Sequence, residues 1–285
     1  MKPSMSAPFL SVCIPAYNAD RYLAATLASV HGQTFTDWEL IVIEDGSRDK
    51  TENIVEAFAQ QGPQRVRFLR QEKNRGLSAT RNTGFAQAKT ELLAILDADD
   101  LWRPEHLELS VAALASAKAD LVFGGCRLFD SDSGTPLEER SPPAGAMSEF
   151  PLSLYDGRVV IQPSTVVMRR AVITRCGGFN SQFPICNDLE FWFRTAKNGC
   201  HFAYTGAVTC DYRKHSMALS KRGAALVAER AEIYSLHNDW ALVPAKQRRR
   251  EMWRHHRDAA RMMFRRDPLR SLGFLWRGNL SRFMG

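Results

Sequence analysis

The chain has 285 residues, 45% of them hydrophobic, so it can bury a full core in one large or two small domains. The formal net charge is +7, but residues 246–285 hold 12 Lys and Arg against 3 Asp and Glu, a local charge of +9. The other residues therefore carry a charge of −2. Because the basic charge belongs to the tail and the body has no RNP-like aromatic pattern, we expect no nucleic-acid partner.

No apolar run approaches the roughly 20 residues that are needed to cross a bilayer, so any membrane contact is expected to be peripheral. The N-terminal apolar run is short and broken by prolines, and we interpret it as a first strand rather than a signal peptide. Six dispersed cysteines without CxxC pairs indicate buried thiols in a reducing compartment, although a hidden disulfide stays open. We therefore expect a cytoplasmic protein, with the inner face of the membrane as its contact surface.

From residue 9 to about 127 the sequence alternates short β-branched runs with longer helical ones. The predicted strands are "FLSVCIP", "WELIVIE", "RVRFLR", "LLAILDA" and "DLVFGGCRLF", and the predicted helices cover about 20–31, 49–60, 77–88 and 104–117. Strands and helices in this alternation are typical of β-α-β units. The pattern predicts an α/β fold with a mixed, mainly parallel sheet that is flanked by helices.

The second half begins with a Ser-, Pro- and Gly-rich stretch, residues 130–158, that predicts a long irregular connection. A strand at "VVIQPSTVVMRR" and a helix at "NDLEFWFRTAKNG", ending at Gly199, are expected next. "CHFAYTGAVTCDYR" predicts a strand pair, and everything from Ala224 onward reads as helical.

Polar residues follow three of the predicted strands, as "PAYN" (15–18), "EDGS" (44–47) and "DADD" (97–100). Ligands of open parallel sheets bind outside the carboxyl ends of the strands. Asp45 or Asp100 alone would more often be a turn former or a helix cap, but three such endings favour a site. Tyr17 offers a ring for stacking on a base, and Asp45 offers an acceptor for a base N–H.

The "DADD" carboxylates are hard oxygen ligands that suit Mn²⁺ or Mg²⁺, which take further ligands from phosphates and water. Neither a "GxxxxGK[ST]" nor a "GxGxxG" motif follows a predicted strand. The metal and basic side chains would therefore have to hold the phosphates.

"SVCIPAYNADRYLAATLASVHGQTFTDWELIVIEDGSRDKT", "NRGLSATRNTGFAQA" and "LAILDADDLWRPEHLE" resemble the family 2 inverting glycosyltransferases, which have the GT-A fold. The resemblance covers about residues 9–215 and implies a nucleotide-diphosphate-sugar donor, commonly a UDP-sugar. The donor-binding residues that it implies are Pro15, Ala16, Tyr17, Asn18, Glu44, Asp45, Arg81, Asn82, Asp97 and Asp99. It further implies that Asp99 and Asp100 face the metal and ribose, whereas Asp97 either joins them or only braces the turn.

The stretch "GGFNSQFPICNDLEFWFRTAKNG" is similar to the segment that carries the catalytic base of the family, and Asp188 matches that base. Asn187 stands where the family usually has Glu. Two alternatives stay open, since Asp188 would also suit the N-terminus of a helix and Glu190 is a rival carboxylate. Residues 212–222 resemble the donor-closing segment, in which His215 would meet the metal or the diphosphate, or else be structural.

The division that follows has a GT-A domain over 1–223, with a nucleotide-binding half (about 9–127) and an acceptor half (about 158–222). A basic helical extension covers 224–285. Five arginines at spacings of 4, 3, 4 and 4 would form one basic helix face, before Pro268 ends the helix; they are Arg250, Arg254, Arg257, Arg261 and Arg265. Such a helix either lies on an anionic membrane or packs its apolar side on the catalytic domain.

The sequence therefore predicts a metal-dependent inverting glycosyltransferase that acts on a hydroxyl of a glycan or lipid-linked acceptor, in cell-surface polysaccharide synthesis. A sugar-nucleotide pyrophosphorylase would want a glycine-rich, Arg-containing loop where "PAYN" stands. A catalytically inactive sugar-nucleotide-binding module is the other alternative, which Asn187 keeps open.

Overall fold

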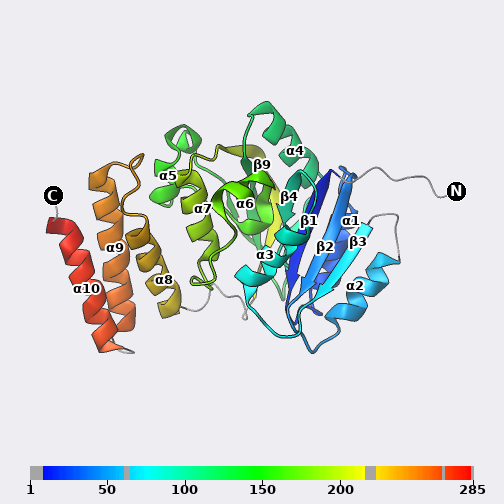
Figure 1. Ribbon diagram of the computed structural model, residues 1–285, viewed down its shortest axis with the longest axis horizontal. Helices are drawn as coiled ribbons and strands as arrows, with labels where there is room; N and C mark the ends of the chain where they lie inside the picture. Colours follow the sequence, from blue (N-terminus) through cyan, green and yellow to red (C-terminus); the bar gives the residue numbers. More distant parts are fainter. Residues whose placement is uncertain (1–8, 61–64, 216–222, 265–266, 284–285) are drawn as a thin grey trace.

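The computed structural model describes residues 9–60, 65–215, 223–264 and 267–283. Its centre is one mixed sheet with the strand order β3-β2-β1-β4-β8-β6-β9-β5, to which β7 adds by pairing with β6 (Figure 1). The strands are β1 (Leu10–Ala16), β2 (Trp38–Glu44), β3 (Arg65–Arg70), β4 (Leu92–Ile95), β5 (Leu101–Trp102), β6 (Leu121–Asp130), β7 (Pro136–Arg140), β8 (Val166–Arg169) and β9 (Phe202–Lys214). The first four strands are parallel, and β8 is antiparallel to both of its neighbours.

Helices cover both faces of this sheet. The helices before the C-terminal extension are α1 (Leu23–His31), α2 (Thr51–Ala59), α3 (Leu77–Gln87), α4 (His106–Ser116), α5 (Leu152–Tyr155), α6 (Ala171–Cys176) and α7 (Asn187–Lys197), with short 3₁₀ turns at Ala146–Glu149 and Pro163–Thr165. Alternate residues of β1 enter two separate hydrophobic clusters, Cys13 in one and Val12 and Ile14 in the other. Burial on both faces explains why these strands are apolar throughout, without a polar alternation.

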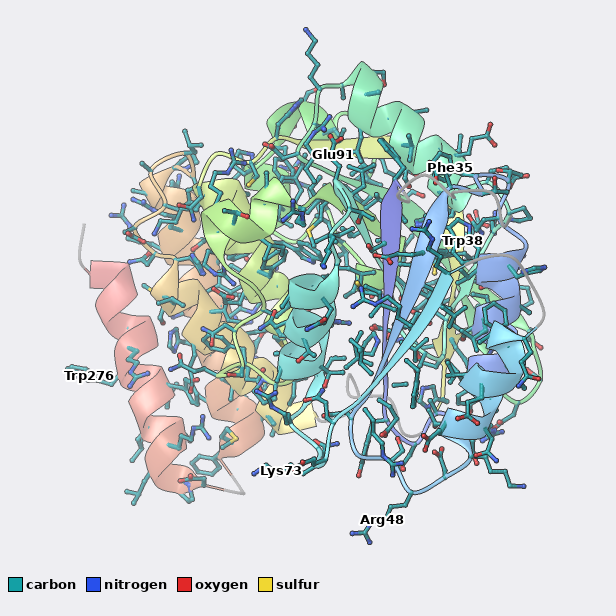
Figure 2. All side chains as sticks on the ribbon, turned by 45° about the vertical axis from the view of Figure 1, so that its right-hand side comes forward. Phe35, Trp38, Arg48, Lys73, Glu91 and Trp276 are labelled. Atoms are coloured by element: carbon teal, nitrogen blue, oxygen red, sulfur yellow. The ribbon has the colours of Figure 1, made fainter. Side chains whose placement is uncertain are left out.

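The parallel strands place their carboxyl ends at one edge of the sheet. β2 begins at Trp38 in the upper half of Figure 2, and the loop that follows it reaches Arg48 at the bottom. Lys73, which follows β3, lies at the same lower edge. The segments after β1, β2 and β3 therefore come together, as the parallel arrangement requires.

The structure confirms the predicted helices of the first half and corrects three predictions in the second. The stretch 202–214 is a single long strand, because a bulge at Gly206, with φ +81°, absorbs the irregularity without reversing the chain. The connection 130–158 contains β7, which lacked a burial signal since four of its five residues are exposed. The strand predicted at 159–170 begins only at Val166, after the Pro163–Thr165 turn.

Three helices, α8 (Gly223–Leu236), α9 (Ala245–Met263) and α10 (Pro268–Phe283), form the C-terminal extension at one end of the molecule (Figure 1). Tyr234 of α8 and the following Trp240 pack on Tyr155 of α5, within one of the two large hydrophobic clusters of the α/β body. A small cluster that includes Ala260 and Phe274 joins the extension's own helices. None of the helices in the described ranges is both long and apolar enough to span a membrane.

We predict that Gly124→Ala lowers the free energy of unfolding by about 1–3 kcal/mol, the usual cost of overpacking a core. A Cβ at Gly124 would lie 2.0 Å from Oγ1 of Thr209 on β9. That oxygen is hydrogen-bonded to Nδ1 of His106. Urea unfolding measures the change. Gly32→Ala is the control, since its nearest contact is 3.5 Å, and equal stability of the two variants would contradict the prediction.

Candidate active site

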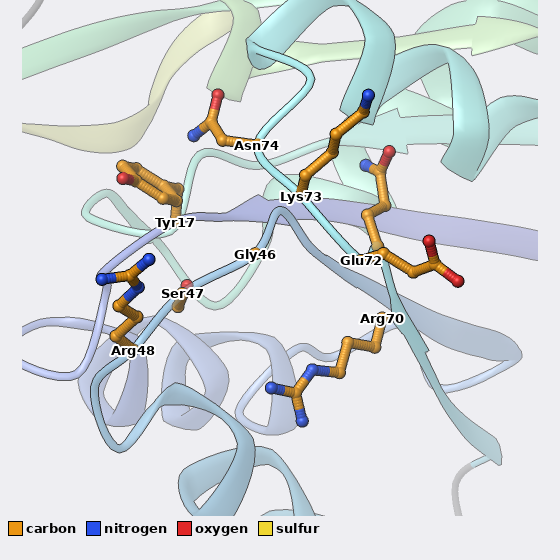
Figure 3. Close-up of a pocket in the computed structure, with 9 residues that line it drawn as sticks. Tyr17, Gly46, Ser47, Arg48, Arg70, Glu72, Lys73 and Asn74 are labelled. Carbon is orange, nitrogen blue, oxygen red and sulfur yellow. The ribbon is translucent and has the colours of Figure 1, made fainter.

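A cavity of about 480 Å³ lies at the carboxyl edge of the sheet, between the segments that follow β1, β2 and β3 (Figure 3). Tyr17 lines it with a side chain that is 52% exposed, as a ring that stacks on a ligand needs to be. Asn74 and Arg48 gather with Tyr17 at one side of the cavity, whereas Glu72 and Arg70 lie at the other. Aromatic, amide and cationic groups thus converge on a single hollow.

The loop after β3 contributes residues that the sequence interpretation missed. Positions 71–74 line the cavity, including the cation Lys73. The signal was present, because residues that follow a parallel strand lie at the ligand edge, and "QEKNRG" follows "RVRFLR" as "EDGS" follows "WELIVIE". Lys73 in this loop and Arg48 are therefore candidates for the cationic side chains that the sequence requires for the phosphates.

Glu44 and Asp45 are buried beneath the cavity and hold its loops together. Asp45 accepts hydrogen bonds from the backbone N–H groups of Arg75 at 2.8 Å and Gly76 at 2.9 Å. Glu44 accepts one from the N–H of Ser47. Gly46, with φ +75°, lets this loop cross the backbone of residues 73–74, which a Cβ would meet at under 3 Å. Both carboxylates thereby fix the walls, while a recognition role for Asp45 stays a prediction.

The residues of the "PAYN" segment, 15–18, also differ in what they contact. Pro15 and Ala16 end β1 as part of the sheet. Asn18 lies in the left-handed region with φ 48°, donates its N–H to Ser47 Oγ at 2.8 Å, and accepts from the N–H of Arg48. The "PAYN" segment is thus braced against the loop after β2, and Tyr17 is its member that lines the cavity.

Arg81 of α3 is the buried cation of the site, with 2% of its side chain exposed. Its Nη2 donates to Oδ1 of Asp97, after β4, at 2.6 Å, and its Nη1 donates to Oδ1 of Asn187, at the start of α7, at 2.7 Å. One guanidinium therefore ties three elements together. It neutralises Asp97, and it uses Asn187 as a neutral acceptor at the position where the resembling family usually carries Glu.

Asn82, the neighbour of Arg81, is engaged with the backbone. Its amide donates to the carbonyl of Phe179 and accepts from the N–H of the same residue, both at 2.8 Å. A Cβ at Gly178 would lie 2.2 Å from the Asn82 side chain, so the glycine permits this close approach. Asn82 joins α3 to the turn before α7, and its donor-pocket role stays a prediction.

Asp99 and His215 are brought together by the structure, 116 residues apart in sequence. Nε2 of His215 lies 2.8 Å from Oδ2 of Asp99, and the ring of His215 packs on Tyr22 with centroids 5.3 Å apart. The Asp99 carboxylate remains partly open to solvent. The rest of the segment predicted to close over the donor, 216–222, lies outside the described residues.

Asp100 differs sharply from Asp99, since it is fully buried. Oγ of Ser164 donates to its Oδ2 at 2.6 Å, and the backbone N–H of Arg213 donates to its Oδ1 at 3.0 Å. Burial, reinforced by the charges of Asp99 and Asp97, raises the pKa of Asp100 well above its ordinary value. Both oxygens are thus engaged within the protein, and the metal role predicted for Asp100 stays a prediction.

Two carboxylates near the start of α7 have distinct surroundings. Glu190 is buried and pairs with Arg194 at 2.8 Å; burial opposes its ionisation, but the neighbouring His237 ring, 3.8 Å away, and the hydrogen bonds from Arg194 prevail and lower its pKa. For Asp188 burial prevails and raises the pKa, against the backbone N–H of Leu189 and the charge of Arg81. Within the described ranges, no cation lies within ion-pair distance of Asp188, whereas Glu190 is paired with Arg194.

The residues around Asp99 fit a divalent cation. In the described part of the chain, no group of three or more His, Cys, Asp or Glu side chains forms a ready-made cage. Mg²⁺ usually binds through one or two side chains and completes its shell with substrate phosphates and water. Asp99 and His215, whose Oδ2 and Nε2 atoms lie 2.8 Å apart, supply a donor set of that kind, and the Asp99 carboxylate is partly open to solvent.

The mixed sheet and the helices around it have the arrangement of the GT-A fold, which two solved structures share. A structure of S. aureus TarS 1–349 in complex with UDP-GlcNAc has a TM-score of 0.70 at 17% identity, and covers 93% of this chain and 78% of that one. The mannosyltransferase PcManGT of Pyrobaculum calidifontis, in complex with GDP-Man and Mn²⁺, has a TM-score of 0.62 at 19% identity, with coverage of 98% and 82%. At these identities the likeness shows the fold.

The chain belongs to glycosyl transferase family 2, because the model of that family matches residues 11–177, more than half of its length. An uncharacterised glycosyltransferase of Methanocaldococcus jannaschii is 28% identical over 75% of this chain and 73% of its own length. One from Nostoc is 32% identical over 67% and 57%. A UDP-Glc:alpha-D-GlcNAc-diphosphoundecaprenol beta-1,3-glucosyltransferase of Escherichia coli is 31% identical over 44% and 48%. The chain thus matches about half the length of the last two.

We predict that Arg81→Met lowers the free energy of unfolding by about 3–5 kcal/mol, because removing one partner of a buried pair leaves the other charge uncompensated. The double variant Arg81→Met, Asp97→Asn should recover part of that loss, since the stranded charge at Asp97 is gone. Urea unfolding of the two single variants and the double variant gives the coupling. Strictly additive losses would contradict a direct interaction between the two side chains.

Proposed function

We propose that this glycosyltransferase is metal-dependent and inverting. It would move a sugar from a nucleotide-diphosphate donor to a hydroxyl of a glycan or lipid-linked acceptor. The observation that carries the proposal is the position of Asp188. Its carboxylate has no ion-pair partner in the described ranges, yet it lies near enough to Arg81 and Asp97 for their charges to shift its pKa.

Inversion needs the acceptor hydroxyl on the face of the anomeric carbon opposite the leaving diphosphate. A carboxylate within about 3 Å of that hydroxyl accepts its proton as the new bond forms. Asp188 is the proposed base, since burial favours proton uptake and Glu190 is committed to Arg194. No covalent intermediate is required, so one base suffices.

The donor is proposed to span the edge from the cavity to Asp99. The nucleobase of the donor would stack on Tyr17, and Arg48 and Lys73 would supply positive charge beside it. Asp99 and His215 would hold Mn²⁺ or Mg²⁺, which stabilises negative charge on a leaving diphosphate when it is bound. The sequence predicts that Asp100 binds the metal itself. In the structure Asp100 accepts hydrogen bonds from Ser164 and from the backbone of Arg213, and we propose that it positions the segment that carries Asp99.

UDP is the proposed nucleotide. Support comes from the E. coli relative, whose name gives UDP-Glc, and from TarS, seen with UDP-GlcNAc. The same name gives GlcNAc-diphosphoundecaprenol, and a Bacillus subtilis relative, 33% identical over 46% of this chain, is named for teichuronic acid biosynthesis. We therefore propose a hexosyl transfer in cell-surface polysaccharide synthesis at the cytoplasmic face of a membrane, with the 1–223 and 224–285 division as catalytic and peripheral-contact parts.

We predict that nucleotide is released from one member of a panel of UDP- and GDP-sugars in the presence of Mn²⁺, and that a chelator abolishes the release. Asp188→Asn should lower kcat by about 10²-fold or more, since general-base catalysis contributes that much, with little change in donor affinity. Coupled nucleotide detection measures the rate, and calorimetry measures donor binding.

Asp239→Asn is the matched control. Asp239 is an exposed aspartate after α8, and it pairs with Lys197 of α7, the helix that carries Asp188. It should leave kcat unchanged. If a donor binds in a metal-dependent way and none is turned over, the chain is the inactive binding module that Asn187 kept open. If Asp188→Asn retains full turnover, the base is another group.

We predict that kcat/KM rises with pH along a limb set by Asp188, because only the ionised carboxylate accepts the proton. Burial raises this pKa above its ordinary value of 3.8, so activity should be lost on acidification at a pH higher than for an ordinary aspartate. Asp97 also raises it, and Arg81 and Arg230 lower it. Arg230→Gln should therefore move the limb to higher pH, and a shift to lower pH would refute the assignment.

A further inference from the structure

The outer face of α10 carries a stripe of apolar side chains that nothing in the described structure covers. Leu269 is 83% exposed, Leu272 58% and Trp276 66%, at helical spacings of three and four that place them on one side. Ser271 and Phe274 are buried on the opposite side, toward α9. Figure 2 shows Trp276 projecting from the end of the molecule, away from the body.

The end of α9 adds to this apolar surface. Phe264, which follows the last residue of α9, is 64% exposed. α10 begins at Pro268, close to this end of α9 (Figure 1), so Leu269 lies at the same end of the extension. We call these four residues, Phe264, Leu269, Leu272 and Trp276, the apolar stripe.

Positive charge surrounds the apolar stripe. Arg261, Arg270 and Arg277 are exposed on α9 and α10, and residues 246–285 together carry a charge of +9, against −2 for the rest of the chain. Arg270 makes one ion pair, with Glu232 at 2.9 Å, and remains half-exposed. Apolar and aromatic side chains within a cationic rim suit the headgroup region of an anionic bilayer, which offers hydrocarbon and negative charge together.

The stripe also lies on the same side of the molecule as the cavity. The end of α9 and the start of α10 lie at the lower edge of the molecule, as do the loops after β2 and β3 (Figure 1). A flat surface that touches these two helix ends therefore lies on the side of the molecule where those loops line the cavity.

We propose that the apolar stripe, with its arginine rim, binds an anionic phospholipid surface and so holds the carboxyl edge of the sheet toward the membrane. This inference rests on the peripheral contact proposed above for residues 224–285, and it is independent of the identity of the donor and of the role of Asp188. A second copy of the chain fits the same face poorly, because pairing would bring two +9 segments together. A nucleic acid would leave the leucines and Trp276 in water.

The test uses the full chain with vesicles of phosphatidylcholine alone, or of phosphatidylcholine with about 30% phosphatidylglycerol. We expect sedimentation with the anionic vesicles only, and its loss when salt rises to about 0.5 M, where the screening length falls to a few ångströms. The triple variant Leu269→Ser, Leu272→Ser, Trp276→Ser should lower the partition coefficient by about 100-fold or more, since each apolar side chain contributes at least tenfold.

The matched control replaces exposed apolar residues elsewhere, by Leu137→Ser, Val160→Ser and Leu242→Ser, which are 51–66% exposed in the parent chain. It should bind vesicles as the parent does. Circular dichroism and nucleotide release in the absence of vesicles verify that both triple variants are folded. Equal binding by the two triple variants, or no binding by the parent, overturns the proposal; a parent dimer that the stripe variant converts to monomer assigns the face to a second copy.

Trp276 gives an independent readout. Of the six tryptophans, four are buried, Trp253 is half-buried beneath Arg257, and Trp276 is exposed. Anionic vesicles should therefore shift the emission to shorter wavelength, and Trp276→Phe should remove that shift while it retains vesicle binding. A shift of equal size in Trp276→Phe would mean that the stripe does not enter the bilayer.

Discussion

The site depends on the hydrogen bonds that the buried guanidinium of Arg81 donates. It joins the start of α7 to the end of β4, through Asn187 at 2.7 Å and Asp97 at 2.6 Å, while it is itself held in α3. Burying a charge costs free energy unless the charge is paired and hydrogen-bonded. The contacts of Arg81 therefore favour one relative position of the three elements. Asp188 follows Asn187 directly, and this clamp therefore also sets where the proposed base lies.

The same principle explains why three neighbouring carboxylates are tolerated after β4. Each of them has a different partner: Arg81 for Asp97, His215 for Asp99, and Ser164 with the Arg213 backbone for Asp100. Asp99 is the most exposed of the three, with 35% of its side chain open to solvent against 22% for Asp97, whereas Asp100 is buried. The three carboxylates thus differ in their surroundings: Asp100 is buried, Asp97 is paired with Arg81, and Asp99 is the most exposed.

The first half of the fold was predictable because its strands are buried on both faces and its helices are regular. All four helices of that half occur within a few residues of the expected bounds. The errors fell where burial left no pattern. β7 is exposed, and β9 continues through a bulge at Gly206 that resembles a turn in sequence. Pairing partners far apart in the chain decided both cases, and local periodicity carries no information about them.

The sequence by itself determined the family resemblance, the edge at which the site lies, and the residue types found there. It also predicted Tyr17 and Asp99 as site residues, since the ends of strands are local features, and the family resemblance supplied Asp188 as the candidate base. The tertiary structure decided how each charge is used: that Asp100 faces inward, that Arg81 reaches Asn187, and that Glu190 is taken up by Arg194. These depend on side chains more than a hundred residues apart or on burial within the assembled core, and burial and distance set the energy of a charge.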